Sequence, residues 1–297
     1  MVERFGFFAV VGRPNVGKSS LVNRLIGEKV SITSRRPQTT RNRILGIRTQ
    51  GTAQIVFVDT PGMQAGQQGL DYSINETAKS SARSADIIGM MIDARGWHDR
   101  DDQVLDYIRY LELPTYLLVN KTDLLHSAGL VLPLIASVSR KHSFTEILPV
   151  SVRRGHNLSR LLSLVEKQLP EGTFGFPTEQ VRVSQREFIV GEFIREQIFH
   201  TVGREVPYSI AVDVTGGRKT QGDGELFRAE VWVESKGQKA IVLGPGGSRL
   251  KNIGSKARRE LSKAFGLPVS LDIWIKIRKG WTNHSQSLEK LGYGPEQ

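Results

Sequence analysis

The residues best suited to chemistry stand near the amino terminus, where GRPNVGKS occupies positions 12–19. This stretch fits the pattern G-x-x-x-x-G-K-[ST], and it lies between an apolar run and a segment with helical periodicity, as that pattern requires. The amides of such a loop and the start of the following helix direct positive partial charge at phosphates. Gly12 and Gly17 would let the backbone turn and approach closely. The stretch predicts a nucleotide phosphate site but does not identify the base.

Two side chains of this loop have a defined chemistry to offer. Lys18 should reach the β- and γ-phosphate oxygens, and Ser19 should supply one ligand to Mg²⁺. A chance G-K-S in a strand-to-helix turn is the alternative, and the flanking pattern argues against it. The loop residues expected at the nucleotide are Gly12, Arg13, Pro14, Asn15, Val16, Gly17, Lys18, Ser19 and Ser20.

Two later segments could complete a metal site beside the phosphates. DTPG follows an apolar run, so Asp59 can hold the metal through water and the amide of Gly62 can meet a γ-phosphate. In the intervening SRRPQTTRNR we expect Thr40, in preference to Thr39, to be the second Mg²⁺ ligand. A threonine that binds only when the γ-phosphate is present makes this segment a switch. The expected metal ligands are Ser19, Thr40 and Asp59, and the expected nucleotide contacts of DTPG are Asp59, Thr60, Pro61 and Gly62.

A third segment, NKTD, could recognise the base. The Asp123 carboxylate can accept hydrogen bonds from both N1–H and the N2 amine of guanine. Adenine has an acceptor at N1 and no N2 amine, so it would leave the carboxylate unpaired and be rejected. Asn120 should tie the loops together, and the stem of Lys121 should cover the base. A backbone amide at Ser151 or Val152 should meet guanine O6.

These segments need strands that end at one edge of a sheet. Short, β-branched apolar runs occur at FFAVVG, AQIVFVDT, DIIGMMIDA, TYLLVNK and EILPVS, as in strands buried on both faces. Helical periodicity fills the gaps at residues 19–25, 103–111, 130–138 and 158–169. This alternation predicts an α/β fold, a mainly parallel sheet with helices on both faces.

The second part of the chain has a different pattern. The stretch LPEGTFGFPTEQ, at residues 169–180, has two prolines and two glycines and is typical of a linker. It is followed by a helix, two strands, a helix, a glycine turn, a helix and a last strand, which predicts an α+β domain. The expected organisation is a nucleotide-binding domain at 1–172, a linker at 173–181, a second domain at 182–280 and a tail at 281–297.

Composition limits the class of protein. The 297 residues suit two globular domains, and the lack of cysteine excludes disulfides, thiolate metal sites and a cysteine nucleophile. The six histidines lack metal-ligand spacing. The amino terminus lacks the pattern of a signal peptide, and no apolar run approaches the roughly 18 residues of a membrane span. We expect a soluble, monomeric, cytoplasmic protein.

Most of the net charge of +11 lies in one block, where residues 236–280 hold eleven lysines and arginines against two acidic residues. Such a surface favours polyanions, with nucleic acid first and an anionic membrane surface second. A merely solvated basic face is the alternative.

The forms GRPNVGKSS, SITSRRPQTTR, DTPG and NKTD resemble the translation-factor-related GTPases. With the second domain, they resemble the Era family of bacterial ribosome-assembly GTPases along essentially the whole chain. The resemblance implies a Ras-like P-loop GTPase domain and a type II KH domain. It also implies slow hydrolysis of GTP to GDP and phosphate, and binding to the 3′ end of small-subunit (16S) ribosomal RNA during 30S subunit maturation. Loose peripheral attachment to the cell inner membrane is a further implication.

The stretch GPGG, between two helical segments, resembles the KH loop that clamps about four single-stranded nucleotides. The residues expected to bind RNA are Gly244, Pro245, Gly246, Gly247, Arg249, Lys251, Lys256, Arg258 and Arg259. Four nearby aliphatic residues either line a base-facing groove or fill the core, and core is the favoured interpretation for Ile241, Leu243, Leu250 and Ile253. Core packing is likewise expected for Trp232, Trp274 and Trp281.

Three positions depart from the family pattern. Val152 replaces alanine, which should not matter because a main-chain amide makes the contact. Met63 stands where Ras-like switches carry the glutamine that orients water, and in related GTPases an asparagine at the position of Asn15 helps hold K⁺ near the phosphates. Pro245 replaces a lysine in the KH loop, which removes a charge and an amide donor. The residues expected in catalysis are Lys18, Asn15 and Thr40.

Two other functions remain open on this basis. The chain could be an RNA-binding assembly factor in which GTP signals occupancy and turnover is incidental. It could also be an ATP-dependent small-molecule kinase with the same phosphate loop, although Asp123 argues against adenine.

The base assignment predicts that Asp123→Asn will weaken GTP binding and favour xanthine nucleotides, because an amide can donate to the xanthine O2 that replaces the guanine amine. Competition of GTP and XTP for the purified variant measures this change. Unchanged affinity for GTP would contradict the assignment of Asp123 to the base.

Overall fold

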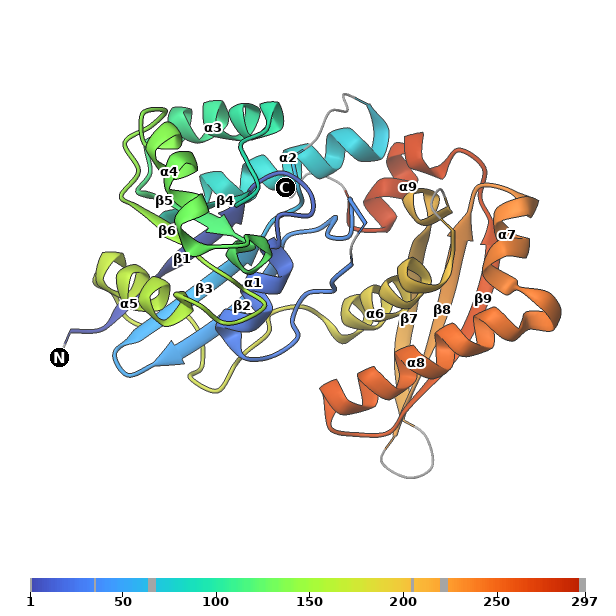
Figure 1. Ribbon diagram of the computed structural model, residues 1–297. Coiled ribbons are helices and arrows are strands. Elements are labelled where there is room, and N and C mark those ends of the chain that lie inside the picture. Colours follow the sequence, from blue (N-terminus) through green and yellow to red (C-terminus); the bar gives the residue numbers. More distant parts are fainter. Residues whose placement is uncertain (1, 35, 64–67, 204–205, 220–223, 294–297) are drawn as a thin grey trace. The chain divides into compact units, whose positions relative to one another are not determined.

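The computed structural model describes residues 2–34, 36–63, 68–203, 206–219 and 224–293. They form two compact units, which are described separately below (Figure 1). The first ends at Val183 and the second begins at Ser184, except that Gln68–Leu70 group with the second. None of the helices in this described part is long and apolar enough to cross a membrane.

The first unit is built on a sheet whose described strands have the order β2-β3-β1-β4-β5-β6. All neighbouring strands run parallel except β2, which is antiparallel to β3. The carboxyl ends of the parallel strands therefore meet at one edge of the sheet. The strands are β1 (Arg4–Val11), β2 (Ile44–Gln50), β3 (Ala53–Asp59), β4 (Ile87–Asp93), β5 (Thr115–Asn120) and β6 (Glu146–Pro149).

Helices cover both faces of this sheet (Figure 1). One core contains side chains of α1 and α5, including Leu21 and Leu161, packed on Phe8 and Val10 of β1. The other contains side chains of α2, α3 and α4 packed on alternate strand residues such as Ala9. The helices are α1 (Lys18–Ile26), α2 (Gly69–Arg83), α3 (Asp99–Leu111), α4 (Leu132–Val138) and α5 (Leu158–Gln168), with short 3-10 turns at Thr122–Leu124 and Ala128–Val131.

The predicted α/β class is confirmed, and its five apolar runs form β1, β3, β4, β5 and β6. Two elements were not predicted. Strand β2 mixes Gly46 with polar residues, and it is a strand because it pairs with β3 along its whole length. Helix α2 buries Ile74, Ala78 and Ala82, which are four residues apart, but two of these are alanines and give a weak hydropathy signal.

The segment predicted as a linker is hydrogen-bonded to the first unit. Gln54 of β3 donates to the carbonyl of Phe176 at 2.8 Å and accepts from its amide at 3.0 Å. The amide of Ile47 in β2 donates to the carbonyl of Val181 at 2.9 Å. These contacts satisfy main-chain groups along the segment.

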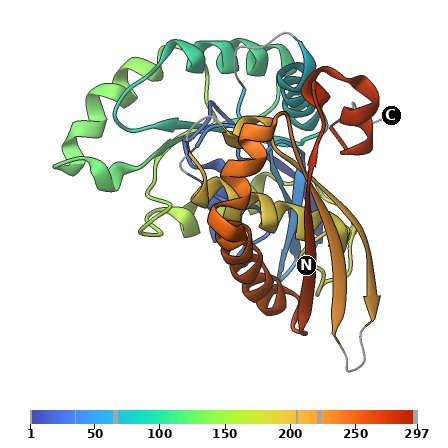
Figure 2. The same ribbon diagram turned by 90° about the vertical axis from the view of Figure 1, so that its right-hand side faces the viewer.

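The second unit has the predicted order of elements, with its described strands arranged β7-β8-β9. β7 and β8 are antiparallel, whereas β8 and β9 are parallel. Figure 2 shows α8 along one face of this sheet, and α6 and α7 also contact the strands. The elements are α6 (Arg186–Thr201), β7 (Ala211–Lys219), β8 (Glu225–Val233), α7 (Lys236–Leu243), α8 (Ser248–Phe265), β9 (Val269–Ile277) and α9 (Ser285–Lys290), with 3-10 turns at Val206–Ser209, Pro245–Gly247 and Trp281–Asn283.

The core of the second unit corrects part of the sequence interpretation. Trp232 and Trp281 are buried and meet edge to face at 6.5 Å between ring centroids, as expected. The prediction for Trp274 was wrong, because this side chain is 65% exposed on β9. A tryptophan at an alternating strand position packs only if its face of the sheet is covered, which the sequence pattern alone does not reveal.

The four aliphatic residues near the glycine turn differ in burial. Ile253 is fully buried and Leu250 is half-buried, as the core interpretation requires. Ile241 and Leu243 are instead exposed, at 40% and 36%, so the core prediction was wrong for both. The buried residue of α7 is Val242, which lies between them.

Candidate functional site

The phosphate loop joins β1 to α1 and has no room for side chains at its two glycines. A Cβ on Gly12, whose φ is +150°, would lie 2.4 Å from the carbonyl oxygen of Met91. A Cβ on Gly17, whose φ is +112°, would lie 2.5 Å from the side-chain nitrogen of Asn120. The loop is therefore pressed against the ends of β4 and β5, and its curved backbone exposes amides at the start of α1.

Lys18 is buried at the first position of α1. Its Nζ donates to the carbonyl oxygens of Gly12 and Arg13, at 3.0 and 3.2 Å. Burial lowers the pKa of Lys18 to about 8, although the nearby Asp59 carboxylate acts in the opposite direction. A phosphate group at this point would supply the negative charge that the buried ammonium lacks.

The side chain of Arg13 forms an ion pair with a helix outside the phosphate loop. Its Nε lies 3.2–3.3 Å from the two carboxylate oxygens of Asp101 in α3, which holds the guanidinium at that helix. Asp101 is buried and also accepts from the amide of His98, at the start of the same helix. The pair fastens the loop to α3. Sequence reasoning missed Asp101 because it lies in an acidic first turn that looks like ordinary helix capping.

The three predicted metal ligands lie within hydrogen-bonding distance of one another. Ser19 Oγ is 2.8 Å from Thr40 Oγ1, and Thr40 Oγ1 donates to Asp59 Oδ2 at 3.3 Å. Thr39 instead donates to the carbonyl of Arg36 at 2.8 Å. Thr40, and not Thr39, therefore faces Ser19 and Asp59, from a segment that also lines the phosphate cavity.

These three oxygens fit a divalent cation. Asp59 is fully buried, and its Oδ1 has no hydrogen-bond partner within the described residues. Burial raises the pKa of Asp59, although hydrogen bonds and Lys18 favour its ionised form. Hydroxyl and carboxylate oxygens are the ligands that Mg²⁺ prefers, and a cation would satisfy the unpaired oxygen.

The rest of DTPG supports the loop. Thr60 Oγ1 donates to the carbonyl of Val10 at 2.7 Å and so holds the end of β3 to β1. Pro61 is buried, and Gly62 lies against Pro14, because a Cβ on Gly62 would be 2.8 Å from the nitrogen of that proline. This contact places the Gly62 backbone beside the phosphate cavity.

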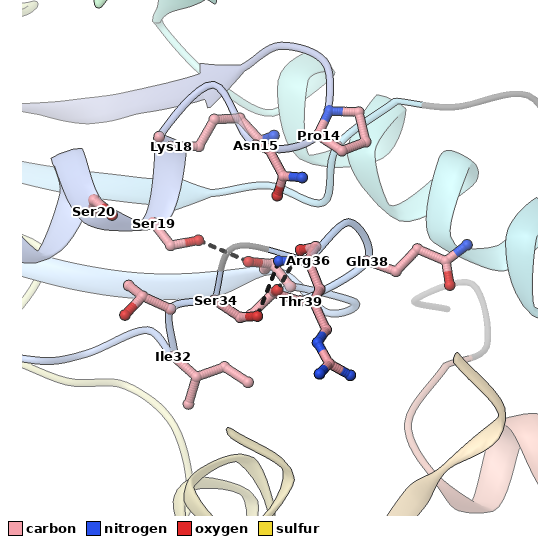
Figure 3. Close-up of a pocket in the computed structure, with 14 residues that line it drawn as sticks. Pro14, Asn15, Lys18, Ser19, Ser20, Ile32, Ser34, Arg36, Gln38 and Thr39 are labelled. Carbon is pink, nitrogen blue, oxygen red and sulfur yellow. Dashed lines mark hydrogen bonds between the residues drawn. The ribbon is translucent and has the colours of Figure 1, made fainter. Parts of the chain in front are cut away.

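Figure 3 shows the phosphate cavity between the loop and the switch segment. Its volume is about 60 Å³, and Pro14 and Asn15 face it from the loop. Asn15 is exposed and has a φ of +64°, and its main-chain carbonyl accepts from Lys121 Nζ at 2.7 Å. Other lining residues are Ser20, Ile32, Thr33, Ser34, Arg36, Gln38 and Thr39.

Asn120 joins three loops at the base site. Its side-chain nitrogen donates to the carbonyl of Val16 at 2.8 Å, and its side-chain oxygen accepts from the amide of Val152 at 3.1 Å. This arrangement is the tie that the sequence predicted for Asn120. It also means that the Val152 amide already has an acceptor, so a bond to guanine O6 would have to be shared with Asn120.

Asp123 lines an adjoining cavity of about 1310 Å³ together with Lys121 and Val152. The Ser151 hydroxyl donates to Asp123 Oδ1 at 2.6 Å and thereby orients the carboxylate. Ser151 therefore acts through its side chain, in addition to the main-chain role that was predicted.

Asp93 and Arg95 were missed by sequence reasoning. Asp93 ends β4, is buried, and accepts from Lys121 Nζ at 2.9 Å and from Arg95 at 2.7–3.0 Å. Burial opposes ionisation, but the hydrogen bonds from Arg95 and Lys121 outweigh it and hold the pKa of Asp93 below its usual range. The carboxylate therefore fixes Lys121 beside the base cavity. An aspartate at the end of the apolar run DIIGMMIDA was the available signal.

The glycine turn of the second unit joins α7 to α8. Gly244, Gly246 and Gly247 all have positive φ, from +55° to +79°, and Pro245 is exposed between them. Arg249 donates to the carbonyl of Ile241 and so caps α7. Four predicted cations of α8 are exposed to solvent: Lys251, Lys256, Arg258 and Arg259. Elsewhere, the described residues form no cluster of three or more side chains suited to a metal.

The buried Lys18 predicts that nucleotide binding takes up protons near pH 8. Its ammonium is about half deprotonated there in the free protein, and a polyphosphate would raise its pKa again. We expect binding of GDP at pH 8 to take up about half a proton, and affinity to fall as the pH rises further. Calorimetry in two buffers of different ionisation enthalpy, with EDTA to exclude metal effects at Asp59, measures this uptake. GMP, which lacks the outer phosphates, is the control, and equal uptake for both nucleotides would contradict the prediction.

Comparison with known proteins agrees with both units. Residues 7–121 match the family model described as 50S ribosome-binding GTPase, and residues 205–282 match the KH domain model. The chain is 42% identical over 291 residues to GTPase Era of Coxiella burnetii (strain Dugway 5J108-111), covering 97% of each chain. It is 40% identical to GTPase Era of Pseudomonas syringae pv. tomato, covering 98% of this chain and 97% of the relative.

Solved structures agree over the same length. A crystal structure of Era in complex with MgGDPNP and nucleotides 1506–1542 of 16S ribosomal RNA has a TM-score of 0.95 and 38% identity, covering 98% of this chain and 99% of that one. An Era variant of Aquifex aeolicus bound to GDP·AlF4⁻ has the same TM-score, identity and coverage. The chain belongs to the GTPase Era family.

Proposed function

We propose that this protein hydrolyses GTP and uses its nucleotide state to control engagement of the 3′ end of small-subunit ribosomal RNA during 30S subunit assembly. The observation that carries the proposal is that Lys18 and Asp123 line adjoining cavities. Asp59 is hydrogen-bonded to Thr40, which lines the first of them. The glycine turn and exposed cations of a KH domain in the same chain support the RNA partner. A partner of this kind places the protein in the cytoplasm.

The residues of the site divide the work of binding. Asp123, oriented by Ser151, selects guanine, while Lys121 is held over the base by Asp93. Lys18 and the loop amides bind the outer phosphates. Ser19, Thr40 and Asp59 would hold Mg²⁺, which when bound neutralises charge on the β- and γ-phosphates.

Hydrolysis requires water to attack the γ-phosphate in line with the leaving oxygen. Met63 is half-buried against the apolar core of the first unit, and a thioether cannot orient that water. We assign part of the missing charge stabilisation to K⁺ held with the help of Asn15. The exposed side chain of Asn15 borders the phosphate cavity, and Lys121 fixes its main chain.

Met63 also favours the second candidate function, an RNA-binding factor in which GTP signals occupancy. The two functions differ in one measurable respect. If hydrolysis drives the cycle, RNA should accelerate the chemical step. If GTP is only a signal, RNA should bind without changing that step.

We expect single-turnover GTP hydrolysis to be faster in the presence of an RNA that carries the 3′ end of small-subunit ribosomal RNA. Rapid mixing of the protein–GTP complex with this RNA measures the rate, and an unrelated single strand of equal length is the control. Tight binding of the 3′-end RNA with no acceleration would favour the occupancy model.

We also expect intrinsic GTP turnover to be faster in K⁺ than in Na⁺ at equal ionic strength, because Na⁺ is smaller and fits the same ligands poorly. The difference should disappear in Asn15→Ala, which keeps the main-chain carbonyl that Lys121 contacts. Ser34→Ala, which alters a residue that lines the same cavity and is not an expected nucleotide contact, is the matched control and should keep the difference. Equal turnover of the unaltered protein in both salts would remove K⁺ from the mechanism.

A further inference from the structure

The sheet of the second unit has one face without helices α6, α7 and α8. Alternate residues of β8 and β9 point away from those helices, and Figure 2 shows α8 on the other side of the strands. Trp274 stands midway along β9, at one edge of this open face, and opposite Glu230 of β8. Its indole is 65% exposed, whereas Trp232 and Trp281 of the same unit are buried.

The residues around Trp274 are charged. Arg228 pairs with Asp272 at 3.8 Å, and Lys276 and Arg278 lie 2.8 and 3.9 Å from Glu230. The hydrogen bond from Lys276 holds the pKa of Glu230 below its usual range, so this carboxylate stays ionised and neutralised. Lys290 pairs with Asp213, the partner of Glu230 on β7, so four cations of this face stand against three carboxylates. The face therefore combines an accessible aromatic ring with an excess of positive charge.

Strand β9 connects this face to the expected RNA site. It lies at the edge of the described sheet, and it contacts both helices that flank the glycine turn. Ile273 lies toward α8, since a Cβ on Gly254 would be 3.2 Å from its Cδ1. The next residue, Trp274, points to the open face. A strand of RNA that leaves the α7–α8 side therefore has to pass only the edge of β9 to reach the indole.

We propose that Trp274 is a stacking platform for an unpaired base of single-stranded RNA that continues from the glycine turn around the edge of β9. This inference rests on the proposed RNA-binding function and adds a contact outside the glycine turn. An aromatic ring accepts any base on its face, while Arg228 and Lys276 are placed to meet the adjacent phosphates. Single-stranded RNA offers both an unpaired base that can stack on the indole and phosphates that can pair with the cations of this face.

RNA affinity of the full-length protein tests the inference. Trp274→Ala should weaken binding of the 3′-end RNA roughly 5- to 150-fold, the range for loss of one stacked base, and Trp274→Phe should retain most of the affinity. Tyr110→Ala removes an exposed aromatic residue of α3 in the first unit and should have no effect. Thermal unfolding of each variant identifies any loss that comes from misfolding.

Salt dependence and fluorescence separate stacking from charge. Trp274→Ala should leave the slope of affinity against salt unchanged, whereas Arg228→Gln should make it less steep by about one counterion. RNA should quench tryptophan fluorescence, and Trp274→Phe should abolish most of that quenching. If the unaltered protein bound no RNA, the proposed function itself would fail. If it bound RNA and a folded Trp274→Ala bound equally well, or only a protein ligand required Trp274, this inference alone would be wrong.

Discussion

The structure of the nucleotide site depends on two opposite charges, Lys18 and Asp59, that are buried close to each other. Burial shifts the pKa of each toward its neutral form, and one oxygen of Asp59 lacks a partner in the described structure. Holding unpaired charge away from water is costly, and a phosphate and a divalent cation would relieve both costs at once. The site is therefore more stable with its ligands, and binding stabilises the fold around it by mass action.

Asn120 makes a site possible from segments that are distant in the sequence. Its side chain hydrogen-bonds the main chain at Val16 and Val152, so the phosphate loop and the base-recognition loop cannot move independently. The parallel sheet provides the framework, because β1, β3 and β5 end at the same edge. Asp93 adds a second link by fixing Lys121, which in turn contacts the carbonyl of Asn15. Base recognition and the phosphate cavity are thus mechanically connected.

The sequence predicted the parts of this arrangement that local chemistry determines. Apolar runs that end in glycine, aspartate or asparagine located the strands and the residues at their carboxyl ends. Properties that arise from packing were not predictable in this way. The pairing of Arg13 with Asp101 and the acceptor already held by the Val152 amide depend on neighbours far along the chain. The strand state of β2 depends on its pairing with the next strand, β3, and not on a hydropathy pattern of its own. Trp274 is the sharpest case, because the alternating pattern of β9 is the same whether a strand face is covered or open. Predictions from local sequence often fail at functional positions, because a residue there is selected for binding and not for packing within its own element.

The switch segment contacts both the oxygens of the proposed metal site and helix α2. Thr40 reaches both Ser19 and Asp59, whereas its neighbour Thr39 closes a local turn with Arg36. Gln38, which has a left-handed backbone, donates to Asp71 in the first turn of α2. A ligand favours one conformation of a protein only if it binds that conformation more tightly than the alternative. The γ-phosphate would therefore have to act through the few atoms that surround Thr40. Because Gln38 is two residues from Thr40, any movement of that threonine would be transmitted to the contact with α2.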